Sequence, residues 1–236
     1  MSRAGLPKEP AHHERERQAP AKRAAIFDMD RTLVRVNTGT LYARWRFRRR
    51  EAGLRDMARV ARWLALYTFG AIDAEAATRS ALRTVAGEDE AEFRALLADW
   101  YRSSVRHHIS PQARAEVERR RAAGDVLAVL SASTPYVVEP LAEDLGIDHV
   151  LCTELEIRDG RLTGRCVDLC YGPHKVRIAE TWAAQHGIDL SKSAFYTDSV
   201  SDAPMLRRVG VRRVVNPDPR LRLLARREGW SVEEWR

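Results

Sequence analysis

The chain has 236 residues, of which 44% are hydrophobic and 31% are charged. At roughly 100–200 residues per domain, this length fits one large domain or one domain with a sizeable insertion. No run of about 18 apolar residues occurs, so no membrane-spanning helix is expected. Three cysteines are too few, and odd in number, for a disulfide framework. The net charge of +7 leaves nucleic-acid binding open until the position of the charge is known.

Residues 1–23 are polar, show no periodicity and lack an apolar signal region. This composition predicts a disordered tail and a cytoplasmic protein. A short apolar run at 24–27 predicts the first buried strand. The stretch 41–109 is expected to be almost entirely helical, with clear spacing at Leu54–Thr68 and from Phe93 to Val105. We therefore expect an inserted helical block at 37–109.

From residue 110 onward, short apolar runs alternate with helical patterns. Ser110 and Pro111 predict a helix start, and Asp159-Gly160 predicts a hairpin turn. Strands are expected at 126–130, 149–153, 154–157, 162–167, 194–196 and 211–215, and helices at 135–145, 174–186, 203–209 and 219–228. This alternation predicts an α/β fold with a Rossmann-like parallel sheet, whose core consists of 24–36 and 110–236.

Polar side chains follow three of the predicted strands. They are Asp28 and Asp30 after the first, Ser131 and Ser133 after the second, and Asp198, Ser201 and Asp202 after the strand at 194–196. Alone, the pair Asp28 and Asp30 fits a turn or cap cluster as well as a site, and the serine group fits a helix cap better than a site. Because ligands gather at the carboxyl ends of parallel strands, three such groups together predict one site. Crowded carboxylates repel each other, and a divalent cation would relieve this; oxygen ligands favour Mg²⁺.

Lys175 begins a predicted helix between the second and third of these groups. A surface lysine is the ordinary interpretation of such a residue. Its place in the chain order favours a second interpretation, in which its ammonium group binds an anionic substrate at the same site.

The run Asp28-Met29-Asp30-Arg31-Thr32-Leu33, followed by Ser131, Lys175 and Asp198 to Asp202, resembles the four motifs of the haloacid dehalogenase (HAD) superfamily. The helical insertion and the hairpin at Asp159-Gly160 are similar to the phosphoserine-phosphatase-like branch, subfamily IB. The resemblance covers about residues 24–230. It implies the HAD fold with a helical cap at 37–109, and a Mg²⁺-dependent phosphatase acting on a phosphate monoester.

The resemblance also implies roles for single residues. Asp28 is the expected nucleophile, forming an aspartyl phosphate, and Asp30 the expected general acid and then base. The expected Mg²⁺ ligands are Asp28, the backbone carbonyl of Asp30, and Asp198. The remaining expectations are phosphate binding by Thr32, Ser131 and Lys175, and support from Asp202 and Ser201. The chain departs from the family at Arg31, where glycine is frequent, and at Ser201, where asparagine is frequent.

The substrate is expected to be a small phosphorylated metabolite other than phosphoserine. Similar phosphoserine phosphatases carry an acidic residue nine positions after the nucleophile, where it pairs with the substrate's ammonium; here that position is Asn37. Arg79, Arg83 and Ser133 are further candidates for substrate contact. Phosphoserine or a phospholipid-related substrate stays open, as does a non-catalytic protein that binds a phosphorylated ligand.

Residues 44–62 contain eight arginines and two acidic residues, interleaved with aromatic ones such as Trp45 and Phe47. A solvated helix is the plainest interpretation. Alternatively, the segment touches an anionic membrane surface or steers an anionic substrate. No nucleic-acid-binding motif accompanies the charge, so no nucleic-acid partner is expected, and the oligomeric state is left open.

Overall fold

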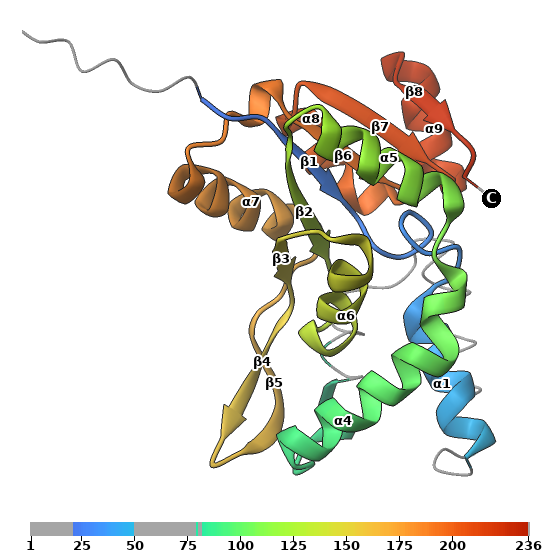
Figure 1. The fold of residues 1–236 in the computed structure, drawn as a ribbon, viewed down its shortest axis with the longest axis vertical. Helices are drawn as coiled ribbons and strands as arrows, with labels where there is room; N and C mark the ends of the chain where they lie inside the picture. The colour runs from blue at the N-terminus through green and yellow to red at the C-terminus, as the bar shows by residue number, and fades with distance from the viewer. Residues whose placement is uncertain (1–20, 50–78, 80–81, 236) are drawn as a thin grey trace, which may run out of the picture.

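A computed structural model describes residues 21–49, 79 and 82–235 of the chain (Figure 1). The helical spacing expected from Leu54 to Thr68, and the arginines at 50–62, lie outside these residues. None of the helices in the described ranges is both long and apolar enough to cross a membrane.

A parallel sheet forms the centre of the described structure, with strands in the order β3-β2-β1-β6-β7-β8. Its strands are β1 (Ala24–Phe27), β2 (Val126–Ser131), β3 (His149–Cys152), β6 (Ala194–Thr197), β7 (Val211–Val215) and β8 (Ser231–Glu233). The predicted α/β fold with a parallel sheet is confirmed. Because β1 pairs with β2 on one side and β6 on the other, the chain order reverses around β1, where open sheets bind ligands.

Helices cover both faces of this sheet. Alternate residues of β1 point to opposite faces: Ala25 and Phe27 join one buried cluster, and Ala24 and Ile26 the other. The first cluster includes α5 (Pro111–Ala122) and α6 (Pro135–Leu145). The second includes α7 (Pro173–His186), α8 (Ala203–Arg208) and α9 (Pro219–Glu228). Two-sided burial explains why the strands read as continuous apolar runs.

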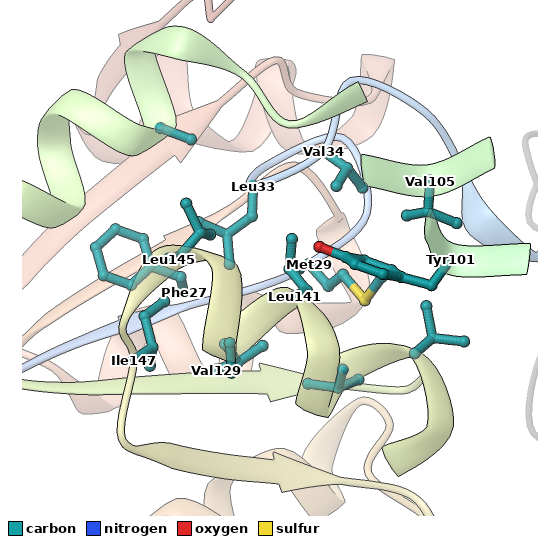
Figure 2. Packing of buried hydrophobic residues seen from close by; sticks show 14 of the residues in the cluster. Phe27, Met29, Leu33, Val34, Tyr101, Val105, Val129, Leu141, Leu145 and Ile147 are labelled. Atoms are coloured by element: carbon teal, nitrogen blue, oxygen red, sulfur yellow. The ribbon is translucent and has the colours of Figure 1, made fainter. Parts of the chain in front are cut away.

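The inserted block packs on the first of these clusters. Its described parts are α1 (Thr38–Arg48), a 3-10 turn (Arg83–Val85), α4 (Glu90–Trp100), a π-helical turn (Tyr101–Val105) and a 3-10 turn (Arg106–His108). Figure 2 shows Tyr101 and Val105 within the cluster that also contains Met29, Val34 and Leu141. The two ends of the block meet, since Val34 pairs with Ile109.

Some boundaries differ from the sequence-based expectation. The block is not helical throughout, because Asp89 pairs with Arg161 and caps α4. The tail expected at 1–23 extends too far, because Lys22 N donates to Gly187 O at 2.9 Å. The strand β8 was not anticipated, and the hairpin of β4 (Glu154–Arg158) and β5 (Arg161–Asp168) forms as expected.

Asn216, just after β7, ties the C-terminal segment to the loop after β1. Its side-chain Nδ2 donates to Arg31 O at 2.8 Å and to Trp235 O at 3.0 Å, and its Oδ1 accepts from Trp235 N at 2.8 Å. Both Arg31 and Asn216 have left-handed backbone conformations, with φ of 55° and 44°. Asparagine adopts this conformation at lower cost than most residues, so a short polar side chain fits the position.

We predict that Asn216→Ala lowers the free energy of unfolding by about 3 kcal/mol, since hydrogen bonds contribute ~1 kcal/mol each and alanine disfavours the left-handed region. Urea denaturation measures this loss. Asn216→Gly is the matched control: it loses the same hydrogen bonds but adopts the left-handed backbone without a steric penalty, so a smaller loss than for alanine is expected. A change of under about 0.5 kcal/mol for the alanine variant would contradict this account.

Candidate active site

The expected site residues lie at the carboxyl edge of the sheet, where the central strands end. Asp28 directly follows β1, Ser131 is the last residue of β2, and Asp198 directly follows β6. Parallel pairing of β1 with both neighbours sets the three ends side by side. Asp28, Ser131 and Asp198 are all buried.

Lys175, in the first turn of α7, lies between two carboxylates. Its Nζ donates to Asp28 Oδ1 at 2.7 Å and to Asp202 Oδ2 at 2.8 Å. Only 3% of the lysine side chain is exposed, which excludes the surface interpretation. Thr197 Oγ1, at the end of β6, also donates to Asp202 Oδ2, at 2.7 Å. Asp202 was expected to support either Lys175 or the metal's water shell, and its contact with Lys175 is the first of these. Thr197 was not anticipated, although its position at a strand end was an available signal.

Burial and charge shift the proton affinities of these groups. Burial raises the pKa of Asp28 to about 7, although the Lys175 ammonium opposes the shift. Burial and then the charge of Asp28 raise the pKa of Asp198 well above its usual range. For Lys175, burial lowers the pKa, but the charges of Asp202 and Asp28 outweigh it and the net shift is upward. The lysine therefore stays a cation.

This charge distribution fits a divalent cation. Beside burial, the charge of Asp28 raises the pKa of Asp198, and the charges of Asp202 and Asp30 raise the pKa of Asp28. Within the described ranges, no three acidic, histidine or cysteine side chains converge into a metal cage. Mg²⁺ is usually held by one or two carboxylates and keeps several waters. The buried Asp28 and Asp198 could supply two carboxylates, and the backbone carbonyl of Asp30 stays an expected third ligand.

Asp30 has a different environment, built by the start of the inserted block. Its Oδ1 accepts hydrogen bonds from Thr38 N at 3.1 Å and Thr38 Oγ1 at 2.8 Å, and its Oδ2 accepts one from Asn37 Nδ2 at 3.0 Å. Burial raises the pKa of Asp30, and the Thr38 hydrogen bonds oppose this shift. Neither donor was anticipated as a partner of Asp30.

The two hydroxyl groups expected to bind phosphate, those of Thr32 and Ser131, differ in their hydrogen bonds. Thr32 Oγ1 is buried and has no hydrogen-bond partner among the described residues, although buried hydroxyls ordinarily have one. Ser131 Oγ accepts from Ser133 N at 3.2 Å, so this hydroxyl retains its own hydrogen as a donor. A ligand with acceptor oxygens would complete these hydrogen bonds.

Three other candidates have contacts elsewhere. Arg79 Nη1 lies 3.6 Å from Cys166 Sγ on the hairpin, and Arg83 begins the turn that packs on Gly164 of β5. These contacts place both arginines against the hairpin. Ser201 Oγ lies 2.9 Å from Ser199 Oγ in the loop after β6, next to Asp202.

Residues 25–207 match the model of the haloacid dehalogenase-like hydrolase family. The chain belongs to this family, which confirms the superfamily expected from the four motifs.

Two relatives with phosphatase names and one solved structure are similar to most of the chain. The chain is 30% identical to a protein named "Probable phosphatase" from Mycobacterium tuberculosis, over 94% of this chain and 81% of that one. It is 30% identical to a "Histidinol-phosphatase" from Neisseria meningitidis, over 89% and 98%. A Bordetella pertussis structure of unknown function is 32% identical, with a TM-score of 0.81 over 90% and 98% of the chains. Family and relatives together identify a phosphoric monoester hydrolase.

We predict that titration of Asp28 opposes folding at neutral pH when metal is absent. An unfolded aspartate has a pKa of ~3.9, against about 7 in the folded chain. Between these values the folded state holds more protons, so this contribution to the free energy of unfolding falls as pH rises from about 4 to about 7, by at most about 1.4 kcal/mol per pH unit.

Urea denaturation with a chelator, at several pH values, measures this slope for the wild type and for Asp28→Asn, which cannot titrate. Equal slopes in the two proteins would contradict the assignment. Metal binding needs the deprotonated carboxylates, so added Mg²⁺ should raise the melting temperature more at pH ~8 than at pH ~5.

Proposed function

We propose that the chain hydrolyses the phosphate monoester of a small metabolite other than phosphoserine, with Asp28 as nucleophile and Asp30 as general acid and base. The observation that carries the proposal is the buried contact of Lys175 with Asp28 and Asp202 at the sheet edge, next to Asp198. Such a buried, costly charge cluster is expected at a functional site rather than in a structural core.

In the first step an Asp28 carboxylate oxygen attacks phosphorus, and the bond from phosphorus to the ester oxygen breaks. The hydrogen bond from Lys175 to Oδ1 orients the Asp28 carboxylate for this attack. Asp30 donates a proton to the departing alkoxide. In the second step Asp30 takes a proton from water, which attacks phosphorus and releases phosphate and free Asp28.

The chain's own donors are suited to the transferring group. Lys175 supplies a fixed positive charge, and the Ser131 hydroxyl retains a hydrogen to donate at the same edge. Thr32 Oγ1 is buried without a partner among the described residues and would reach the phosphate only after a local rearrangement. When bound by Asp28, Asp198 and the backbone carbonyl of Asp30, Mg²⁺ would neutralise carboxylate charge and stabilise the charge that develops on the phosphoryl oxygens.

We predict that Asp28→Asn abolishes phosphate release from para-nitrophenyl phosphate in the presence of Mg²⁺, because the amide has nearly the same shape but is not a nucleophile. Asp30→Asn should lose about 10²–10⁴-fold in kcat. Beryllofluoride with Mg²⁺ should raise the melting temperature of the wild type and not of Asp28→Asn. Full activity in Asp28→Asn would refute the role of Asp28 as the nucleophile. A wild type that binds phosphate but releases none from the ester would favour a non-catalytic binding protein.

The substrate preference rests on Asn37. Its Oδ1 accepts from Thr40 N and Thr40 Oγ1, both at 2.9 Å, and its Nδ2 donates to Asp30. The residue thus brings no negative charge to pair with a substrate ammonium. The names of two relatives give different substrates. One is a phosphoserine phosphatase of Mycobacterium tuberculosis, 32% identical over 90% of this chain. The other is the Neisseria meningitidis protein, which is named a histidinol-phosphatase.

We predict that phosphoserine is a poor substrate. A panel of phosphorylated metabolites that includes histidinol phosphate, with phosphate release as the readout, should give phosphoserine a kcat/KM no higher than that of the other esters. Asn37→Glu introduces the acidic side chain but removes the donor to Asp30, so its kcat/KM on phosphoserine is compared with its own kcat/KM on the other esters, and this ratio should rise. A phosphoserine kcat/KM more than about tenfold above the rest of the panel would overturn the preference; tenfold corresponds to about 1.4 kcal/mol.

The role of the arginine-rich segment, residues 44–62, stays a prediction. In its described part, Arg46 Nη1 donates to Tyr42 OH at 3.0 Å and Arg49 stacks on Trp45, with 4.8 Å from its guanidinium carbon to the ring centroid. Peripheral contact with an anionic membrane and steering of the substrate are both compatible with these contacts.

A further inference from the structure

We infer that Asn37 is a positioning residue for Asp30, through which the first helix of the inserted block sets the geometry of leaving-group protonation. This inference rests on the proposed function, in which Asp30 is the acid. The sequence had placed Asn37 only among the residues that contact substrate.

The first step is the hydrogen-bond geometry around Asp30. Asn37 Nδ2 donates to Oδ2 at 3.0 Å, while the Thr38 amide and hydroxyl donate to Oδ1 at 3.1 and 2.8 Å. Both oxygens are therefore held, and the carboxylate plane is fixed by two adjacent residues. Of these donors, only Asn37 contacts Oδ2, so its loss would leave Oδ2 without a donor from the described residues.

The second step is what holds Asn37 itself. The residue is the N-cap of α1, and its Oδ1 accepts from Thr40 N and Thr40 Oγ1, both at 2.9 Å. One amide side chain thus uses its oxygen to cap the helix and its nitrogen to hold the acid. Aspartate or serine would cap the helix about as well as asparagine. Neither could donate to Asp30 from the same geometry, since aspartate has no donor and serine is shorter.

The third step is the consequence for catalysis. A general acid works only from a correct position, and small displacements cost rate. Protonation matters most for basic leaving groups and least for stable anions such as para-nitrophenolate. Loss of the Asn37 hydrogen bond should therefore slow the enzyme in proportion to the basicity of the leaving group. A role in helix capping alone would slow all esters equally.

The experiment compares kcat/KM for para-nitrophenyl, phenyl and benzyl phosphate, because kcat/KM reports the steps up to formation of the phosphoenzyme. None of these esters carries an ammonium, so contact with a charged substrate group plays no part. Asn37→Ser keeps the cap and loses the donor. We expect it to lose about tenfold on benzyl phosphate and under about twofold on para-nitrophenyl phosphate.

Thr40→Ala is the matched control, because it removes one hydrogen bond to Asn37 Oδ1 and leaves the contact with Asp30. It should show the wild-type dependence on the leaving group. Asn37→Ala, which loses both functions, should match Asn37→Ser in that dependence and have a lower melting temperature. An equal loss on all three esters in Asn37→Ser would overturn the inference.

Asp30→Asn separates this result from failure of the proposed function. Suppose that the loss of kcat/KM in Asp30→Asn grows steeply with the basicity of the leaving group, while Asn37→Ser behaves as the wild type does. Asp30 is then the acid, and only the positioning role of Asn37 is refuted. If Asp30→Asn and the wild type show the same dependence, Asp30 is not the acid, and both the proposed function and the inference fail.

Discussion

The buried contact of Lys175 with Asp28 and Asp202 is the constraint on which the rest of the site depends. It joins three separate parts of the fold: the end of β1, the first turn of α7 and the loop after β6. Taking such charges out of water costs several kcal/mol per ion, and removing one partner leaves another charge buried and unpaired. Apolar side chains of similar volume in place of these three residues would often be at least as stable. The arrangement therefore indicates chemistry that needs a fixed cation beside a carboxylate of raised proton affinity.

One lysine does not balance the acidic side chains around it. The pKa of Asp28 is raised by burial and by the charges of Asp202 and Asp30, and the pKa of Asp198 is raised by burial and by the charge of Asp28. Protons or a divalent cation would neutralise the remaining negative charge. In the proposed mechanism the cation would also keep Asp28 deprotonated at neutral pH, so stability and activity would depend on the same ion.

Much of this could be predicted from the sequence, for identifiable reasons. Helix boundaries at Pro135, Pro173 and Gly187 follow local rules that act within a few residues. The proximity of Asp28, Ser131 and Asp198 was predictable because parallel strands place their carboxyl ends together. The short, polar strand β8 was not, since Ser231–Glu233 forms a strand only through pairing with β7. The contact between Asn37 and Asp30 depends on the conformation of the loop between β1 and α1. The pattern of apolar and polar residues does not predict that conformation.

The loop between β1 and α1 shows how the insertion and the chemistry are joined. Ser110 N donates to Leu33 O at 2.9 Å and Arg35 N donates to His108 O at 2.9 Å, so both ends of the inserted block are anchored within a few residues of Asp30. The residues that anchor the block are followed at once by Asn37 and Thr38, which hold the Asp30 carboxylate. Among the described residues, the start of α1 thus contacts the Asp30 carboxylate directly, whereas Lys175 bonds to Asp28 and Asp202. In the proposed mechanism, the protonation of the leaving group by Asp30 is therefore linked to the inserted block through Asn37 and Thr38.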